Sequence, residues 1–401
     1  MISVTQFGET LRQILEEEAN ELAKETGFIQ RERIITGADF VQTLIFGWLE
    51  EPEITLDGFT QIAQRREVEI TASGWHQRFT PEAVALMERL TQVRLEAEAA
   101  PVALLKRFTA VIVEDSSTIS LPDELAELWR GCGGSAGSSQ AMLKLFVRWN
   151  VLTGDLRGPL LTQGRHADGK SPFNEDEVPA GGLYLADLGF FALWRLQRLS
   201  QRRAGRKRYY LLRLPVGTRL YTRAGHQLEL RGIVPQQEGA AVELGVLVGK
   251  QARVPTRLLL QRVPKEVAEQ RRKRIREEAH DHGYEPSEEA LYLAGWTIVV
   301  SNVPRRLLSL EECLVVLTVR WQIERLFRLW KEDGMIDEWR SKKRWRILCE
   351  IYAKLAAMLG GKRPQYPKGR HRDQCRRWPT GKGWASSKQP RKTNLRVGSL
   401  T

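Results

Sequence analysis

The chain has 401 residues, of which 42% are hydrophobic and 28% are charged, a balance typical of a folded globular protein and not of a disordered chain. Its formal net charge of +13 indicates a polyanionic partner, with nucleic acid ahead of a membrane surface. No apolar run approaches the roughly 20 residues needed to span a bilayer, the N-terminus lacks a signal-peptide pattern, and the four cysteines show no paired spacing, so we expect a cytoplasmic protein with reduced thiols.

Residues 1–105 are predicted to form a helical domain. Apolar residues recur at helical spacing from Phe40 to Leu49, and Thr36-x-x-Asp39 just before them resembles a capping box. Short helical segments around a turn follow, which fits a helix-turn-helix that contacts DNA. The first 100 residues hold 9 basic and 18 acidic residues, so a helical packing domain without DNA contact fits equally well.

The pattern changes to strands at residue 106, which predicts an α/β fold. The apolar run FTAVIVE at 108–114 is typical of a buried strand, and further strand-like runs lead through residue 186 into a helix. We expect the first part of an α/β core over 106–204 and a mainly β insert over 205–290. The second part of the core then covers 291–360, with a strand at 296–301 and a long helical stretch at about 308–359.

The last segment, residues 361–401, differs in composition from the rest of the chain. It holds 12 Lys or Arg residues against one acid, together with four prolines. Such a composition predicts a disordered, basic tail.

Three acidic residues occupy positions that suggest chemistry. Asp115 follows the apolar run VIVE, Asp187 follows LYLA, and Glu324 lies in the long helical stretch. A carboxylate at the end of a buried strand is costly unless it is exposed in a cleft, hydrogen-bonded or bound to metal. Two such carboxylates and one from a helix can bind a pair of Mg²⁺ ions for phosphoryl transfer. Either aspartate could instead be a turn residue at a strand end, and we expect Asp155, Asp168 and Asp176, in polar loops, to have no role beyond that.

The helix around Glu324 adds basic residues on the same face. Arg320 precedes Glu324 by four positions and Lys331 follows it by seven, so the three side chains share one helical face. Such a face can hold a metal ion through the acid while the bases contact phosphates. A solvated face with salt bridges is the alternative.

The three motifs together resemble those of DDE transposases of the insertion sequence 4 family. Asp115 lies in EDSSTISLP, Asp187 in ADLGFF and Glu324 in RWQIERLFRLWK. The resemblance implies an RNase H-like core interrupted by the β insert, with Asp115, Asp187 and Glu324 as catalytic residues that bind two Mg²⁺ ions, for which Mn²⁺ substitutes. It also implies cut-and-paste cleavage and strand transfer of double-stranded DNA, at transposon ends and target, by a nucleoid-associated homodimer with no membrane partner.

The resemblance also suggests DNA-binding residues. It assigns Arg320 and Lys331 to DNA near the transposon end, and it matches Trp296 to an aromatic residue that stacks on a flipped base in some relatives. A tryptophan in the core at the start of a strand is the alternative for Trp296. The basic run after the signature helix, with Lys342, Lys343 and Arg344, is predicted to be a further DNA patch.

Two features depart from the family pattern. Leu317 replaces the tyrosine of the signature helix, and the chain becomes basic and proline-containing after residue 359, where the family continues as a helix. The segment 361–401 is therefore either a frameshifted end or a genuine basic DNA-binding tail. These departures leave a second function open, namely a catalytically degenerate transposase that acts as a DNA-binding inhibitor of transposition.

Overall fold

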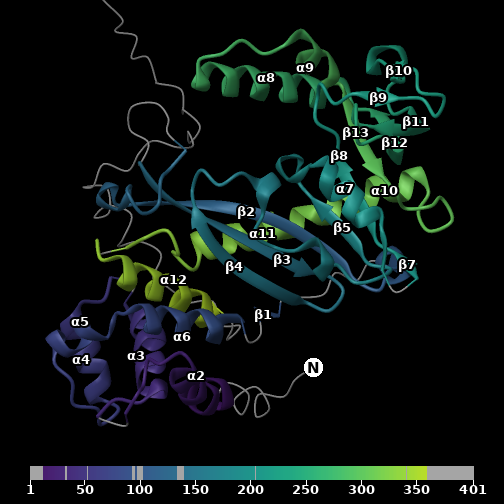
Figure 1. The fold of residues 1–401 in the computed structure, drawn as a ribbon. Coiled ribbons are helices and arrows are strands. Elements are labelled where there is room, and N and C mark those ends of the chain that lie inside the picture. The colour runs from purple at the N-terminus through teal and green to yellow at the C-terminus, as the bar shows by residue number, and fades with distance from the viewer. Residues whose placement is uncertain are drawn as a thin grey trace, which may run out of the picture.

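The computed structural model describes residues 12–31, 34–51, 53–92, 95–96, 103–132, 140–203, 205–339 and 341–358 (Figure 1). The predicted basic tail, residues 361–401, lies outside the described residues. The fold is mixed α/β, as predicted, with one large sheet and helices on its faces and at one end. None of the helices in the described ranges is long and apolar enough to cross a membrane.

Helices occupy most of residues 12–92. α3 begins at the predicted capping box: the Thr36 hydroxyl accepts a hydrogen bond from the Asp39 N–H at 3.1 Å, and Asp39 accepts one from the Thr36 N–H at 3.0 Å. Aromatic residues fill the space between these helices, among them Phe40 and Trp75, whose rings are buried. The helices are α2 (Ala19–Glu25), α3 (Gly37–Glu50), α4 (Leu56–Gln64), α5 (Ala72–Arg78) and α6 (Pro81–Gln92).

The last described helix, α12 (Arg344–Met358), packs against α3 and α6. It lies between these N-terminal helices and the sheet in Figure 1. The Thr91 hydroxyl of α6 donates a hydrogen bond to the Tyr352 carbonyl of α12 at 3.2 Å. The long helix predicted over 308–359 is therefore wrong in its extent, because the chain forms α10 (Leu310–Leu317), α11 (Trp321–Glu332) and α12, separated by a short 3₁₀ turn and by a loop.

The large sheet has the strand order β1-β4-β3-β2-β5-β8-β13-β12-β11-β9-β10. β2 pairs antiparallel with β3 and parallel with β5, and β5 pairs parallel with β8. The strands of residues 220–301 extend the same sheet beyond β8. The strands are β1 (Leu95–Glu96), β2 (Val111–Leu121), β3 (Ala141–Asn150), β4 (Asp155–Gln163), β5 (Leu183–Ala186), β8 (Tyr209–Arg213), β9 (Leu220–Tyr221), β10 (Gln227–Leu228), β11 (Ala241–Val248), β12 (Val254–Arg262) and β13 (Trp296–Ser301), with β6 (Arg202–Arg203) and β7 (Arg206–Lys207) as a separate pair.

Both faces of the sheet carry a hydrophobic core. On one face, Val113 and Val147 of β2 and β3 pack with Ile323 and Phe327 of α11. On the other face, Phe146 of β3 packs with residues of β5 and of α7 (Leu193–Ser200). Because successive side chains of a strand point to opposite faces, Asp115 lies on the α11 face, and its neighbours on β2 lie on the α7 face. The helices α8 (Lys265–His282) and α9 (Glu288–Leu293) lie at the far end of the sheet from α2–α6 (Figure 1).

Candidate active site

Asp115 lies in the middle of β2 and not at a strand end. The prediction of a strand end at this residue is wrong, because the polar run after it remains paired with β3 as far as Leu121. The Asp115 side chain is 14% exposed, and its Oδ1 accepts a hydrogen bond from the Ser116 N–H at 2.8 Å. This carboxylate is therefore largely removed from water on the face that α11 covers.

Asp187 follows β5 directly, as predicted. In the parallel pair of β2 and β5, Glu114 is in register with Ala186, so the residues that follow, Asp115 and Asp187, lie beside each other at neighbouring strands. Asp187 precedes a short 3₁₀ turn, Leu188–Phe190, and its side chain is 44% exposed. The parallel register thus brings together two carboxylates that are 72 positions apart in the chain.

Glu324 and Arg320 reach the same place from α11 and the turn before it. The Arg320 Nη1 atom lies 2.6 Å from Glu324 Oε1 and 3.7 Å from Asp115 Oδ2, and its Nε atom lies 3.7 Å from Asp187 Oδ1. The Arg320 side chain is only 6% exposed. Three predicted site carboxylates, from three separate segments, therefore surround one buried guanidinium.

Burial dominates the electrostatics of this cluster. It raises the pKa of Asp115 to about 7, and the negative charges of Asp187 and Glu324 act in the same direction. The Ser116 N–H and the Arg320 charge oppose the shift and do not cancel it. Three carboxylates with one arginine leave an excess of negative charge, which is the condition that favours binding of a cation.

The chemistry of the donors fits Mg²⁺ or Mn²⁺, because all three side chains offer carboxylate oxygens. Within the described ranges, no three Asp, Glu, His or Cys side chains meet closely enough to form a finished metal site. Arg320 occupies the space between the carboxylates, where it supplies the positive charge that they need. A divalent cation at this position would take over that role from Arg320.

Lys331 lies further along α11 and is half-buried. Its Nζ donates a hydrogen bond to the Thr118 carbonyl of β2 at 2.9 Å, and burial lowers the pKa of its ammonium group. Lys331 therefore ties α11 to the strand that carries Asp115. Its predicted contact with DNA stays a prediction.

Trp296 opens β13 and lies inside the hydrophobic core of the α7 face, with 5% of its surface exposed. Its indole N–H donates to the Pro235 carbonyl at 2.7 Å, the Arg262 guanidinium lies 4.1 Å from its ring centroid, and the Tyr292 ring lies 4.8 Å away. In this arrangement the ring is covered by neighbours. A base could stack on it only after one of those neighbours moved.

The predicted basic patch lies just before α12 and at its first residue. Lys342, Lys343 and Arg344 are exposed, and Lys342 forms an ion pair with Glu124. Arg340, at the start of the same run, lies outside the described residues. Leu317, where the resemblance to the family leads us to expect tyrosine, ends α10 and is 8% exposed within the core of the α11 face.

One residue that contacts β2 behind the site was not singled out from the sequence. Asp168, predicted to be a loop residue, accepts a hydrogen bond at 2.7 Å from the hydroxyl of Ser116, the residue that follows Asp115 on β2. No periodic pattern in the sequence indicates this contact of Asp168, because Ser116 is 52 positions away in the chain. Asp155 and Asp176, the other two loop candidates, bond to Thr153 and to Arg198 and Arg208 instead.

Comparisons with known proteins identify the family of the chain. The family described as "Transposase DDE domain" matches residues 106–359, which is more than half of the chain. A transposase of the insertion sequence element IS231F from Bacillus thuringiensis subsp. israelensis is 24% identical over 88% of this chain and 78% of its own length. Those of IS231E from B. thuringiensis subsp. finitimus and IS1151 from Clostridium perfringens are 26% and 24% identical, over 88% and 85% of this chain and 78% and 76% of their own lengths.

Among solved structures, the chain is similar to a piggyBac transposase in a synaptic complex with hairpin DNA. The TM-score is 0.40 with 10% identity, over 87% of this chain and 73% of the other. The family match covers the core strands and α11, with Asp115, Asp187 and Glu324 all inside it. The chain therefore belongs to the family of transposases with a DDE domain, as the resemblance of its three motifs predicted.

Proposed function

We propose that this transposase cleaves and rejoins transposon-end DNA in a metal-dependent, cut-and-paste reaction, with Asp115, Asp187 and Glu324 as its catalytic residues. The observation that carries the proposal is the convergence of these three carboxylates on one buried arginine. The order β4-β3-β2-β5-β8, with β2 antiparallel to β3 and parallel to β5, supports an RNase H-like core. In such a core Asp115 lies on the central strand β2, Asp187 follows the parallel neighbour β5, and Glu324 lies on the helix α11 that covers the sheet.

Asp115, Asp187 and Glu324 would hold the metal ions through their oxygens. Two bound Mg²⁺ ions, or Mn²⁺ in their place, supply an activated water or hydroxyl nucleophile and stabilise the leaving oxygen in phosphodiester chemistry. Asp115 contributes a carboxylate that is held in place, because it lies within a paired strand and accepts a hydrogen bond from the Ser116 N–H. Asp187, which is half-exposed, faces the solvent side from which DNA would approach.

Arg320 and Lys331 have separate roles in the proposal. Arg320 balances the carboxylates in the free protein and would turn to a phosphate of the transposon end when the cations take its place. Lys331 holds α11 against β2 and would add positive charge near the bound strand. Exposed Lys342, Lys343 and Arg344 would contact the backbone of double-stranded DNA further from the cut, on a homodimer that joins two ends and the target.

The direct test is nicking of a duplex that carries the terminal inverted repeat of the encoding element, with Mg²⁺ or Mn²⁺. Asp187→Ala should abolish nicking and leave binding of the same duplex within about twofold. Undiminished nicking by this variant would refute the catalytic assignment. Binding by the unchanged protein without nicking, even with Mn²⁺, would instead favour the inhibitor function.

A further inference from the structure

The connection between β4 and β5, residues 164–182, contacts both segments that carry the proposed catalytic aspartates. It contains two short 3₁₀ turns, Asp168–Lys170 and Glu175–Glu177, and lies on the α7 face of the sheet. Asp115 points to the opposite face, so the connection lies behind the site. We define this connection as the brace.

The first contact of the brace is with β2. Asp168 Oδ1 accepts hydrogen bonds from the Ser116 hydroxyl at 2.7 Å and from the Lys144 ammonium at 3.1 Å. Lys144, on β3, also donates to the His166 carbonyl of the brace at 2.7 Å. Ser116 in turn donates its N–H to Asp115 Oδ1 at 2.8 Å. A single residue, Ser116, therefore links Asp168 to Asp115.

The second contact of Asp168 is with the turn that follows Asp187. A Cβ atom at Gly189 would lie 2.8 Å from Asp168 Oδ2, which is closer than real Cβ contacts allow. Gly189 does not have a left-handed backbone, so a larger side chain there is disfavoured by the closeness of Asp168 and not by the backbone conformation. The Asp168 carboxylate therefore contacts both segments. Its Oδ1 accepts from Ser116, which follows Asp115, and its Oδ2 lies near Gly189, the second residue after Asp187.

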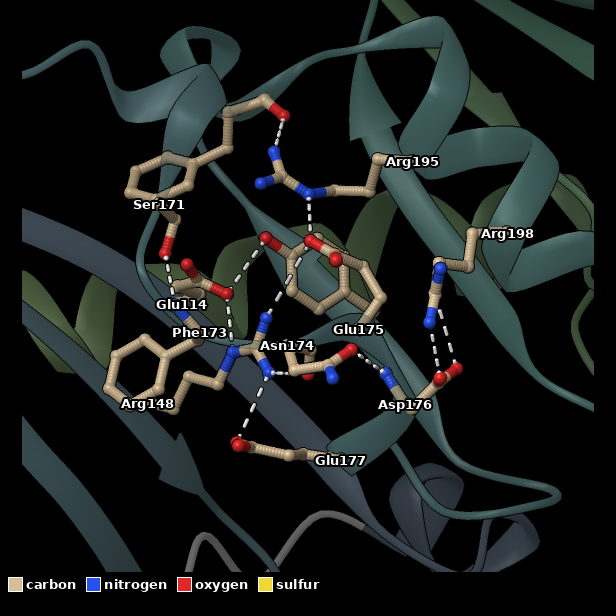
Figure 2. A network of polar contacts seen from close by, with 12 residues as sticks. Glu114, Arg148, Ser171, Phe173, Asn174, Glu175, Asp176, Glu177, Arg195 and Arg198 are labelled. Carbon is tan, nitrogen blue, oxygen red and sulfur yellow. Dashed lines mark hydrogen bonds and ion pairs between the residues drawn. The ribbon is translucent and has the colours of Figure 1, made fainter.

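A buried chain of charges joins the same two segments deeper in the core (Figure 2). Glu114 of β2 pairs with Arg148 at 2.5 Å, Arg148 lies 3.9 Å from Glu175 of the brace, and Glu175 pairs with Arg195 at 2.7 Å. Arg195 donates to the Phe190 carbonyl, which ends the turn after Asp187. These four charged side chains are at most 4% exposed, so each depends on its partner to remain buried.

We propose that Asp168 is a positioning residue that fixes the distance between Asp115 and Asp187, with the Glu175 chain as the fixed support behind it. The inference rests on the proposed function, because it assumes that both aspartates act in one site. Such a site needs its groups held to within a fraction of an ångström, and a misplacement of 1 Å can cost about a hundredfold in rate. Asp168 acts through Ser116 and Gly189 and does not itself contact the reacting atoms.

The test compares Asp168→Ala with Asp168→Asn in the nicking assay on the terminal-repeat duplex. The alanine variant should lower kcat about tenfold to a hundredfold and leave the KM for DNA within about twofold. The asparagine variant should retain activity within about threefold, since its Oδ1 can still accept from Ser116 and Lys144. Loss of activity in both variants to the level of Asp115→Ala would overturn the proposal, because it would indicate a direct ligand.

Two further variants keep the result interpretable if Asp168→Ala folds poorly. Ser116→Ala breaks the same link from the other side and should lower kcat in the same way. The matched control is Asp155→Ala, which removes a carboxylate that also accepts from a nearby hydroxyl, that of Thr153 at 2.6 Å, but lies in β4 away from both aspartates. The control should nick at the rate of the unchanged protein.

A double-mutant cycle tests the contact with Gly189. Gly189→Ala should lower kcat on its own and should cost much less in the Asp168→Ala background, where Oδ2 is gone. The same fold-loss in both backgrounds would overturn the link to Asp187. If Asp115→Ala itself nicks normally, the proposed function fails. If Asp115→Ala is inactive while Asp168→Ala and Ser116→Ala nick normally, only the positioning role fails.

Discussion

Arg320 and Glu324 lie one helical turn apart, and the Arg320 Nη1 atom is 2.6 Å from Glu324 Oε1. The same guanidinium is 3.7 Å from both Asp115 and Asp187. The side chain of Arg320, from the turn before α11, thus lies among the three carboxylates that we propose hold the metal ions. The proposed function therefore links binding of a divalent cation to the position of Arg320, because the cation and the guanidinium would neutralise the same three carboxylates.

Replacing Arg320 should change cation binding and DNA binding in opposite directions. Arg320→Ala removes a competing positive charge from three carboxylates, so the affinity for Mn²⁺ should rise several-fold while affinity for the terminal-repeat duplex falls. Titration calorimetry with Mn²⁺ in the absence of DNA measures the first effect. Arg328→Ala, which removes an exposed charge from the same helix, is the control and should leave Mn²⁺ affinity unchanged. Weaker Mn²⁺ binding by Arg320→Ala would contradict the linkage.

The convergence of the acids could be predicted from the sequence only in part. Asp187 follows a short apolar strand, and the pattern placed it correctly at the strand end. Asp115 follows a similar run, yet β2 continues through the polar residues to Leu121, because hydrogen bonds to β3 depend on the backbone and not on side-chain polarity. The sequence therefore indicated which residues meet, and the register of β2 with β5 explains how.

Contacts between distant segments explain what the sequence could not show. The helical pattern over 308–359 hides a loop, where Met335 has a positive φ of 45° and where Lys354 of α12 donates to the Met335 and Glu338 carbonyls. The pattern around Asp168 predicts only a loop residue, because its contacts with Ser116 and Gly189 join positions far apart in the chain. Local periodicity detects elements, whereas these contacts arise from packing.

Lys331→Ala should affect stability as well as DNA binding. The substitution removes the donor to the Thr118 carbonyl, which should lower the free energy of unfolding by about 1–2 kcal/mol in urea titrations. If the ammonium also contacts a phosphate, the slope of log affinity against log salt should fall by about one. An unchanged free energy of unfolding would contradict the structural role, whatever happens to DNA affinity.

Trp296→Phe separates the core role of this residue from base stacking. Phenylalanine keeps an aromatic ring but loses the indole donor to the Pro235 carbonyl, so the free energy of unfolding should fall by about 1 kcal/mol. A duplex with 2-aminopurine near the transposon end reports stacking through its fluorescence. Because neighbours cover the ring, we expect no quenching by Trp296 in the absence of metal ions. Strong quenching that is lost in Trp296→Ala would contradict this expectation.

Asp176→Asn should weaken the fold in a pH-dependent way. Hydrogen bonds from Arg198 and Arg208 lower the pKa of Asp176 to about 2, below the ordinary value of 3.8. Because the folded-state pKa is the lower one, the ionised carboxylate stabilises the fold above about pH 4, and this contribution is lost as the pH falls through 2. Urea unfolding should therefore show a deficit for Asp176→Asn at pH 7 that shrinks toward pH 2. Asp155→Asn is the control, and an equal deficit for Asp176→Asn at every pH would contradict the ionic origin of this stabilisation.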